Sequence, residues 1–138
     1  RHAVEFFNGT PRNPSWTSDI NRAKPVFEDP HGVNAHVSCT FNKAIDRYIL
    51  LTMRSSDEGI KRGFGIFESD RPWGPWSTVY YTSNLDSFVP GLTQLINLSL
   101  PSKWISRDGK SMWLVFSGRP SDPLYSFNLI KVKLDMPR

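Results

Sequence analysis

Residues 35–53 read AHVSCTFNKAIDRYILLTM, and this stretch decides the fold class. Apolar and polar residues alternate over residues 35–41, which is the pattern of a half-buried β-strand. The polar residues 42–46 (NKAID) predict a tight turn. Residues 47–53 (RYILLTM) are strongly apolar and predict the partner strand. The stretch therefore predicts an antiparallel β-hairpin.

Short β-like segments separated by turn residues continue on both sides of this hairpin. The other predicted strands are residues 3–7, 25–28 (an edge piece), 63–68, 77–81, 103–106, 111–117 and 124–134. Residues 107–110 (RDGK) contain Asp-Gly between apolar runs, which is a strong hairpin signal because the turn needs positive φ. Residues 83–100 fit either a short helical turn or a long loop.

The composition fits one all-β domain. The chain has 138 residues, of which 38% are apolar, enough to bury a core, and 13% are aromatic; 11 Pro and 9 Gly are spread throughout. The net charge of +4 is scattered, without the clustered Lys/Arg stripe of a nucleic-acid binder, so no nucleic acid is expected. No apolar run approaches the ~18 residues that a membrane span needs, so no membrane partner is expected.

Cys39 is the single cysteine, which excludes an internal disulfide, a CxxC zinc site and an iron–sulfur cluster. It shares one face of the predicted strand with Val37 and Phe41, and we expect it to be a buried small residue. The three histidines show no metal-ligand spacing. We therefore expect neither a metal site nor a cofactor.

Aromatic residues recur at a regular interval along the chain. Phe7, Phe67 and Phe127 are evenly spaced, Trp16 and Trp76 repeat the same interval, and Tyr48 and Trp113 are separated by a slightly longer one. A four-stranded antiparallel unit that recurs at such a spacing is typical of a propeller blade. We therefore expect a single partial β-propeller domain over residues 1–138, with about two and a half blades: an outer half-blade at 3–28, a full blade at 34–82 and an incomplete last blade at 100–134. The alternative is a β-sandwich with accidental spacing.

Three stretches of the sequence resemble those of known propellers. Residues 71–76 (RPWGPW) resemble the PxGPW element that links the third and fourth strands of a blade in glycoside-hydrolase-like five-bladed propellers, and residues 47–53 resemble their second strands. Residues 101–118 (PSKWISRDGKSMWLVFSG) resemble the last-blade hairpin of an uncharacterised secreted family, domain of unknown function 4185, which is related to propeller arabinanases. The similarity extends from Val4 to Leu134 and implies the C-terminal blades of such a propeller.

The resemblance implies carboxylates gathered around a central funnel and a polysaccharide or oligosaccharide substrate. Glycoside hydrolysis uses two carboxyl groups, ~5 Å or ~6.5–9.5 Å apart, one of which stays protonated. Asp57 and Glu58 follow the strand at 47–53 in a loop, where function often lies, and are the catalytic candidates. A solvated acidic loop is the alternative interpretation.

The substrate-binding candidates are Asn34, His36, Arg54, Lys103 and Trp104. Asn34 and His36 open the predicted innermost strand of the full blade, and Lys103 and Trp104 lie on the equivalent strand of the last one. Trp104 offers a ring for stacking on a sugar, and Arg54 offers hydrogen bonds to carboxylate or hydroxyl groups. Ordinary packing and hydrogen-bonding roles are the alternative for each. Asp46, Asp70 and Asp108 are expected to stabilise turns.

The expected function is therefore that of the C-terminal part of a secreted, carbohydrate-active propeller that hydrolyses polysaccharide by acid/base chemistry. The sequons at Asn8 and Asn97 favour secretion, and the first residue, Arg1, suggests a piece of a longer protein. A non-catalytic carbohydrate-binding propeller and a protein-interaction scaffold are the alternatives. Fewer than three blades leave a propeller open, so we expect either missing blades or a homo-oligomer that closes the ring.

Overall fold

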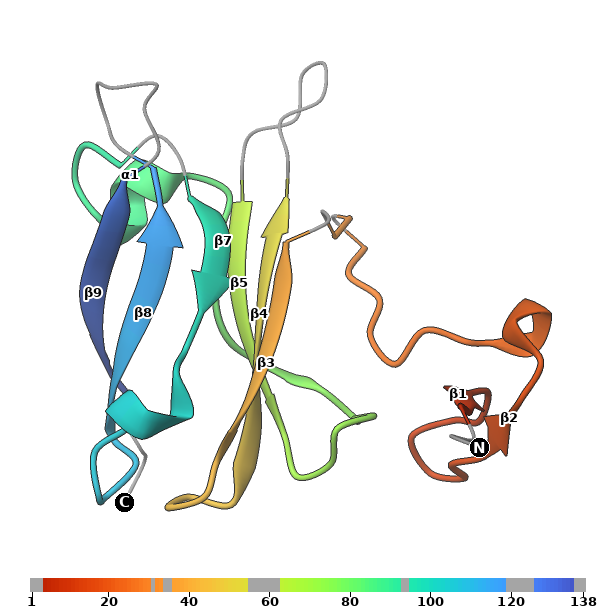
Figure 1. Ribbon diagram of the computed structural model, residues 1–138. Coiled ribbons are helices and arrows are strands. Elements are labelled where there is room, and N and C mark those ends of the chain that lie inside the picture. The colour runs from red at the N-terminus through yellow and green to blue at the C-terminus, as the bar shows by residue number, and fades with distance from the viewer. Residues whose placement is uncertain are drawn as a thin grey trace.

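The computed structural model describes residues 4–30, 32–33, 36–54, 63–92, 95–118 and 126–135, and it is an all-β structure of three antiparallel sheets (Figure 1). A two-stranded sheet contains β1 (Phe6–Phe7) and β2 (Trp16–Thr17). The central sheet contains, in order, β3 (Val37–Asn42), β4 (Arg47–Arg54), β5 (Gly63–Ser69) and β6 (Ser77–Thr82). The C-terminal sheet contains β7 (Ile96–Ser99), β8 (Ser111–Ser117) and β9 (Phe127–Lys133). The short helices are η1 (Ile20–Arg22), α1 (Leu85–Phe88) and η2 (Ser102–Trp104).

The hairpin that the sequence predicts at 35–53 is confirmed. Strands β3 and β4 pair antiparallel from Val37 opposite Thr52 to Asn42 opposite Arg47. The turn between them ends at Asp46, whose φ of 53° lies in the left-handed region that Asp tolerates. β4 is then flanked on both sides by strands, which explains why residues 49–53 are all buried.

The hydrophobic core lies between the central and C-terminal sheets. Ile49, Leu51 and Phe64 of the central sheet pack in one cluster with Met112 and Leu114 of the C-terminal sheet. The first strands of the two sheets, β3 and β7, are in contact. This is the arrangement of neighbouring blades in a partial β-propeller, as the sequence predicts.

The N-terminal segment covers part of the opposite face of the central sheet. The ring of Phe27 packs on Phe67 of β5 with centroids 4.6 Å apart and meets Trp76 edge-on at 6.3 Å. The indole Nε1 of Trp76 donates a hydrogen bond of 3.0 Å to the carbonyl of Val26. The two-stranded sheet is joined to the β5–β6 connection by an edge-to-face contact of Trp16 with Trp73, at 5.9 Å.

The connection from β5 to β6 contains residues 71–76, so this motif links the third and fourth strands of the central sheet, as the resemblance implies. Gly74 has a φ of 86°, and its amide donates to the carbonyl of Arg71 at 3.1 Å. A Cβ at Gly74 would lie 2.9 Å from Cδ1 of Trp76, so glycine allows the tryptophan to fold back over the turn.

Two strand predictions are wrong. Residues 25–28 form no strand, and Pro25 lacks the amide that a ladder would use. Residues 103–106 are not a strand either, because Pro101 starts the 3₁₀ turn η2 and accepts a hydrogen bond of 2.9 Å from the amide of Trp104. The first strand of the C-terminal sheet is instead β7, which lies in the segment 83–100 that has no clear sequence pattern.

The prediction that Cys39 is buried is also wrong. Val37, Cys39 and Phe41 do share one face of β3, but all three side chains are exposed there. The reason is that β3 is an edge strand and that Phe27 packs over β5 rather than β3. The atoms around the sulfur still exclude some water, and this desolvation raises the pKa of the Cys39 thiol.

The regular aromatic spacing locates equivalent strands but not equivalent side chains. Phe67 and Phe127 lie on β5 and β9, the third strand of each sheet. Phe67 points away from the C-terminal sheet and is covered, whereas Phe127 points away from the central sheet and is 70% exposed. In a rotational repeat, equivalent side chains of two blades point in the same direction around the ring. Phe67 and Phe127 do not, so the residue of β9 that is equivalent to Phe67 lies one position away from Phe127.

Candidate functional site

The predicted catalytic residues, Asp57 and Glu58, lie outside the described residues, and so does Asn34. The other predicted binding residues fall into two separate groups. His36 and Arg54 lie at the same end of the central sheet, where β3 begins and β4 ends. Lys103 and Trp104 belong to η2, near the other end of β3.

Side-chain hydrogen bonds show that η2 lies near the C-terminal end of β3. Thr40 Oγ1 donates to the carbonyl of Leu100 at 2.7 Å, and Asn42 Nδ2 donates to the carbonyl of Gly109 at 2.8 Å. The segment 100–109 therefore lies beside the second half of β3. His36 precedes Thr40 by four residues, which is about 13 Å of extended chain. The structure does not bring His36 and Trp104 into one site.

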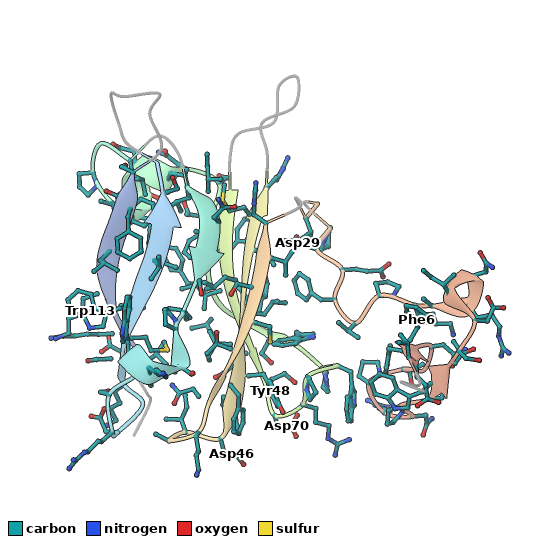
Figure 2. All side chains as sticks on the ribbon, viewed as in Figure 1. Phe6, Asp29, Asp46, Tyr48, Asp70 and Trp113 are labelled. Carbon is teal, nitrogen blue, oxygen red and sulfur yellow. The ribbon has the colours of Figure 1, made fainter. Side chains whose placement is uncertain are left out.

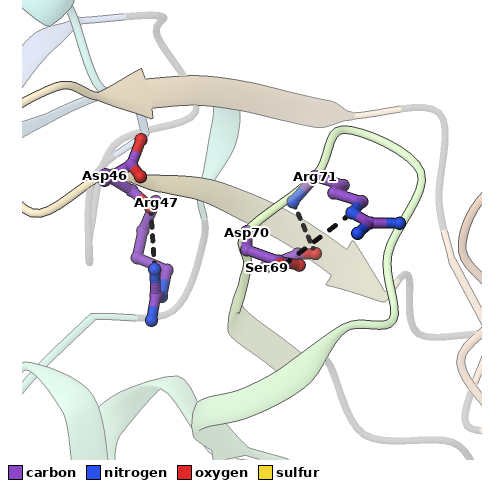
Figure 3. Close-up of polar contacts among 5 residues, drawn as sticks. All are labelled: Asp46, Arg47, Ser69, Asp70 and Arg71. Carbon is purple, nitrogen blue, oxygen red and sulfur yellow. Dashed lines mark hydrogen bonds and ion pairs between the residues drawn. The ribbon is translucent and has the colours of Figure 1, made fainter.

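Asp46 and Asp70 lie in turns at the end of the central sheet opposite Arg54 (Figure 3). Arg47 Nη1 donates to the backbone carbonyl of Asp46 at 2.9 Å, and the carboxylate of Asp70 lies 3.9 Å from Arg71 Nε. The amide of Arg71 donates to Ser69 Oγ at 3.1 Å, which closes the turn. Both members of the Asp70–Arg71 pair are more than half exposed, so the pair contributes little to stability.

Asp108 also acts as a turn residue. Its Oδ1 accepts hydrogen bonds from Ser106 Oγ at 2.5 Å and from the amide of Lys110 at 3.1 Å. Both hydrogen bonds lower the pKa of the Asp108 carboxyl, and the bond from Ser106 has the larger effect. A general acid needs a shift in the opposite direction, so this shift does not suit that role, and the two hydrogen bonds hold the Asp108 side chain in the turn.

A first aromatic hollow lies on the outer face of the C-terminal sheet, which points away from the central sheet. Trp104, Trp113 and Leu129 line a hollow of about 280 Å³. Trp104 is 44% exposed, and the Lys131 ammonium lies 5.9 Å from the centroid of the Trp113 ring. Trp104 was predicted from the sequence, but Trp113 and Leu129 were missed. Side chains alternate between the two faces of the strand at 111–117 (SMWLVFS), so Trp113 lies on the face opposite Met112 and Leu114. This alternation was the sequence signal that could have identified Trp113.

A second hollow, which we call the acidic–aromatic hollow, lies between the N-terminal segment and the central sheet. It has a volume of about 390 Å³, and its lining residues are Phe27, Glu28, Asp29, Pro30, Phe67, Trp76, Thr78 and Tyr81. Figure 2 labels Asp29, which lies on the segment just before the central sheet. The hydrogen bond from the Trp76 indole to the Val26 carbonyl holds the ring against the N-terminal segment, although the two residues are 50 positions apart in the sequence. No sequence pattern shows that Glu28 and Trp76 meet, which is why both were missed.

The two hollows differ in chemistry. The first is formed by apolar surface beside a lysine. The acidic–aromatic hollow combines aromatic faces, which pack on the C–H faces of sugar rings, with carboxylates, which accept hydrogen bonds from hydroxyls. Among the residues that the structure describes, no group of His, Cys, Asp and Glu is arranged to hold a metal ion.

No family model, curated protein or solved structure matches this chain. Within the described part of the chain, no helix has the length and apolar character needed to cross a membrane. Fold and site together define a class: an all-β protein of stacked antiparallel sheets, arranged as in a partial propeller, with an acidic–aromatic hollow between its N-terminal segment and its central sheet.

Proposed function

We propose that this chain is part of a secreted, carbohydrate-active β-propeller of the glycoside-hydrolase-like kind, and that it binds a sugar unit of a polysaccharide or oligosaccharide in the acidic–aromatic hollow. The observation that carries the proposal is the meeting of Trp76 and Tyr81 with the carboxylates of Glu28 and Asp29 around one hollow of about 390 Å³. A volume of this order suits a small ligand, since such sites measure roughly 300–1,000 Å³.

The lining favours a neutral, hydroxyl-rich ligand. The carboxylates disfavour phosphate-bearing ligands, whereas sugar hydroxyls donate hydrogen bonds to them. The aromatic part needs an apolar surface on the same ligand, and the C–H face of a sugar ring supplies one. A purely apolar ligand would leave the carboxylate of Glu28 without a hydrogen-bond donor on the ligand.

Hydrolysis is the finer part of the proposal and rests on the resemblance of the chain to glycoside-hydrolase-like propellers. Asp57 and Glu58 are its proposed acid/base pair. Binding and hydrolysis are separable: a chain that binds sugar without releasing product is a carbohydrate-binding propeller segment.

The binding test is calorimetric titration of the chain with a panel of soluble oligosaccharides, pentose-containing ones first. We expect saturable binding that Glu28→Gln weakens about 10-fold, because the amide keeps the shape of the side chain but accepts hydrogen bonds less strongly than a carboxylate. Glu5→Gln, an exposed glutamate outside the hollow, is the matched control and should bind as the unmodified chain does. Reducing-sugar release with and without Asp57→Asn tests hydrolysis.

Each outcome decides between alternatives. Loss of binding with Trp104→Ala but not with Glu28→Gln would move the sugar to the hollow on the C-terminal sheet and overturn the proposed site. Absence of binding across the panel would overturn the function itself. Product release that Asp57→Asn leaves unchanged would remove Asp57 from the catalytic pair.

A further inference from the structure

Among the residues that the structure describes, strand β9 forms a free edge of the C-terminal sheet. Within the described ranges, β9 pairs with β8 alone, whereas β5, the third strand of the central sheet, pairs with both β4 and β6 (Figure 1). The C-terminal sheet therefore has three strands where the central sheet has four. A free edge presents a row of amides and carbonyls that another extended segment can pair with.

The register shows which residues of β9 point their backbone groups toward the free edge. The amide of Leu134 donates to the carbonyl of Lys110 at 2.8 Å, next to the pair Ser111–Lys133. Backbone groups alternate in direction along an antiparallel strand, so the even-numbered residues of β9 bond β8. The amides and carbonyls of Phe127, Leu129, Lys131 and Lys133 then point outward.

A cleft runs beside this edge. It has a volume of about 450 Å³ and lies between β6 and β9. Ile66, Tyr80 and Phe88 line it from the central sheet and α1, and Val132 lines it from β9. A strand added to β9 would direct alternate side chains into this cleft, on the side of Val132. Glu68, Lys133 and Asp135 also line the cleft, so its charges are mixed. Those side chains should be apolar, to match the apolar side chains that line it.

The other face of β9 sets the charge of the incoming strand. Lys131 and Lys133 are exposed on this face, and residues directly opposite them on an added strand would form cross-strand pairs. Acidic side chains stabilise such pairs, and basic ones destabilise them. The edge, the cleft and the two lysines therefore favour an incoming strand whose side chains alternate between apolar and acidic.

We propose that the free edge of β9 binds an extended peptide segment with this apolar–acidic alternation, which adds to the C-terminal sheet as a fourth strand. This is β-strand addition, in which main-chain hydrogen bonds give affinity and alternate side chains give specificity. The peptide pairs with the C-terminal sheet, whereas the acidic–aromatic hollow lies against the central sheet, and Thr78 lines both the cleft and that hollow. This proposal does not depend on carbohydrate binding. A second copy of the chain, paired edge to edge through β9, is the competing occupant.

The test uses the whole chain and a fluorescein-labelled peptide, Glu-Val-Glu-Val-Glu-Val-Glu, acetylated and amidated at its ends, measured by anisotropy. A Lys-Val peptide of the same length is the charge-reversed control. We expect saturable binding of the glutamate peptide, at least 10-fold tighter than that of the lysine peptide, and weaker at high salt. In the Lys131→Glu/Lys133→Glu variant this preference should reverse.

A proline variant separates edge pairing from surface attraction. Leu129→Pro removes an amide that points outward and makes no bond to β8, and proline is tolerated on edge strands. We expect it to weaken peptide binding at least 10-fold, whereas Leu129→Ala, which keeps the amide, should change binding by less than about 3-fold. Circular dichroism checks that both variants fold, and the double glutamate variant provides an independent test.

Three results would overturn the proposal. One is the absence of saturation at millimolar peptide. Another is equal binding by the Leu129→Pro and Leu129→Ala variants. The last is a concentration-dependent dimer in light scattering that Leu129→Pro dissociates and that excludes the peptide, since the edge would then belong to a second copy.

Discussion

Substitution of Gly109 tests the contact between the turn before β8 and the turn after β3. Gly109 has a φ of 73°, and a Cβ there would lie 2.8 Å from both Asn42 Oδ1 and Ile45 Cγ2. Asn42 is fully buried and donates to the carbonyl of Gly109, so it has little room to move. Gly32 offers a matched control, because its φ is 85° but a Cβ there meets nothing within 4 Å.

The expected magnitudes follow from these two environments. Left-handed backbone costs an L-residue about 1–2 kcal/mol, and both Gly109→Ala and Gly32→Ala incur this cost. Overpacking against the buried turn adds about 1–3 kcal/mol at Gly109 alone. For 138 residues, an unfolding entropy of about 2.1 cal/mol/K per residue makes 1 kcal/mol worth ~3 °C in Tm. The Tm of Gly109→Ala should therefore lie ~3–10 °C below that of Gly32→Ala.

Urea and thermal unfolding, followed by circular dichroism and tryptophan fluorescence, measure both variants beside the unmodified chain. If the two alanine variants lose equal stability, the close packing of Gly109 on Asn42 and Ile45 is refuted, and only the backbone term remains. A Gly109→Ala variant as stable as the unmodified chain would refute the left-handed conformation as well.

Three further outcomes are expected. Alkylation of Cys39 by iodoacetamide should have a pH midpoint above the ~8.5 of an ordinary thiol, and urea should restore the ordinary value. The pKa of Asp108 is lowered in the folded state. The ionised carboxylate therefore stabilises the fold above the unfolded pKa of ~3.9, and this stabilisation is lost as pH falls through the folded pKa. Ser106→Ala should raise the folded pKa in an NMR titration, and an unchanged titration would contradict the assigned cause. Phe27→Ala should lower the free energy of unfolding by about 1–3 kcal/mol, whereas Phe127→Ala, at an exposed position, should stay within about 0.5 kcal/mol.

The strands of the central sheet, and β8 of the C-terminal sheet, could be predicted because each carries its own local pattern. Residues 35–53 contain a full hairpin signal, and alternation along 111–117 fixes which side chains face the core. These periodicities depend only on neighbouring residues, so they survive without knowledge of the partner. Residues 96–99 carry no such pattern, and their pairing with β8 is decided by contacts with the rest of the sheet.

The candidate site was less predictable because its parts are distant in sequence. Trp76 and Glu28 line one hollow although they lie far apart along the chain, and only the packing of the N-terminal segment brings them together. Trp104 was identified as a potential sugar platform, but its place on η2 depends on Pro101, whose effect outweighs the apolar pattern around it. Sequence reasoning names residue types that suit a chemistry; it does not place them side by side.

The core between the two sheets has a consequence for how the chain is made. Ile66 of the central sheet packs in one core with Leu114 of the C-terminal sheet, which is synthesised much later. At ~5–20 residues per second, translation from Ile66 to Leu114 leaves this core incomplete for ~2–10 s. During that interval a nascent chain carries an exposed, strand-forming surface, which is the kind of intermediate that chaperones bind. The yield of folded protein should therefore depend on translation speed between Ile66 and Leu114 more than on codon choice elsewhere.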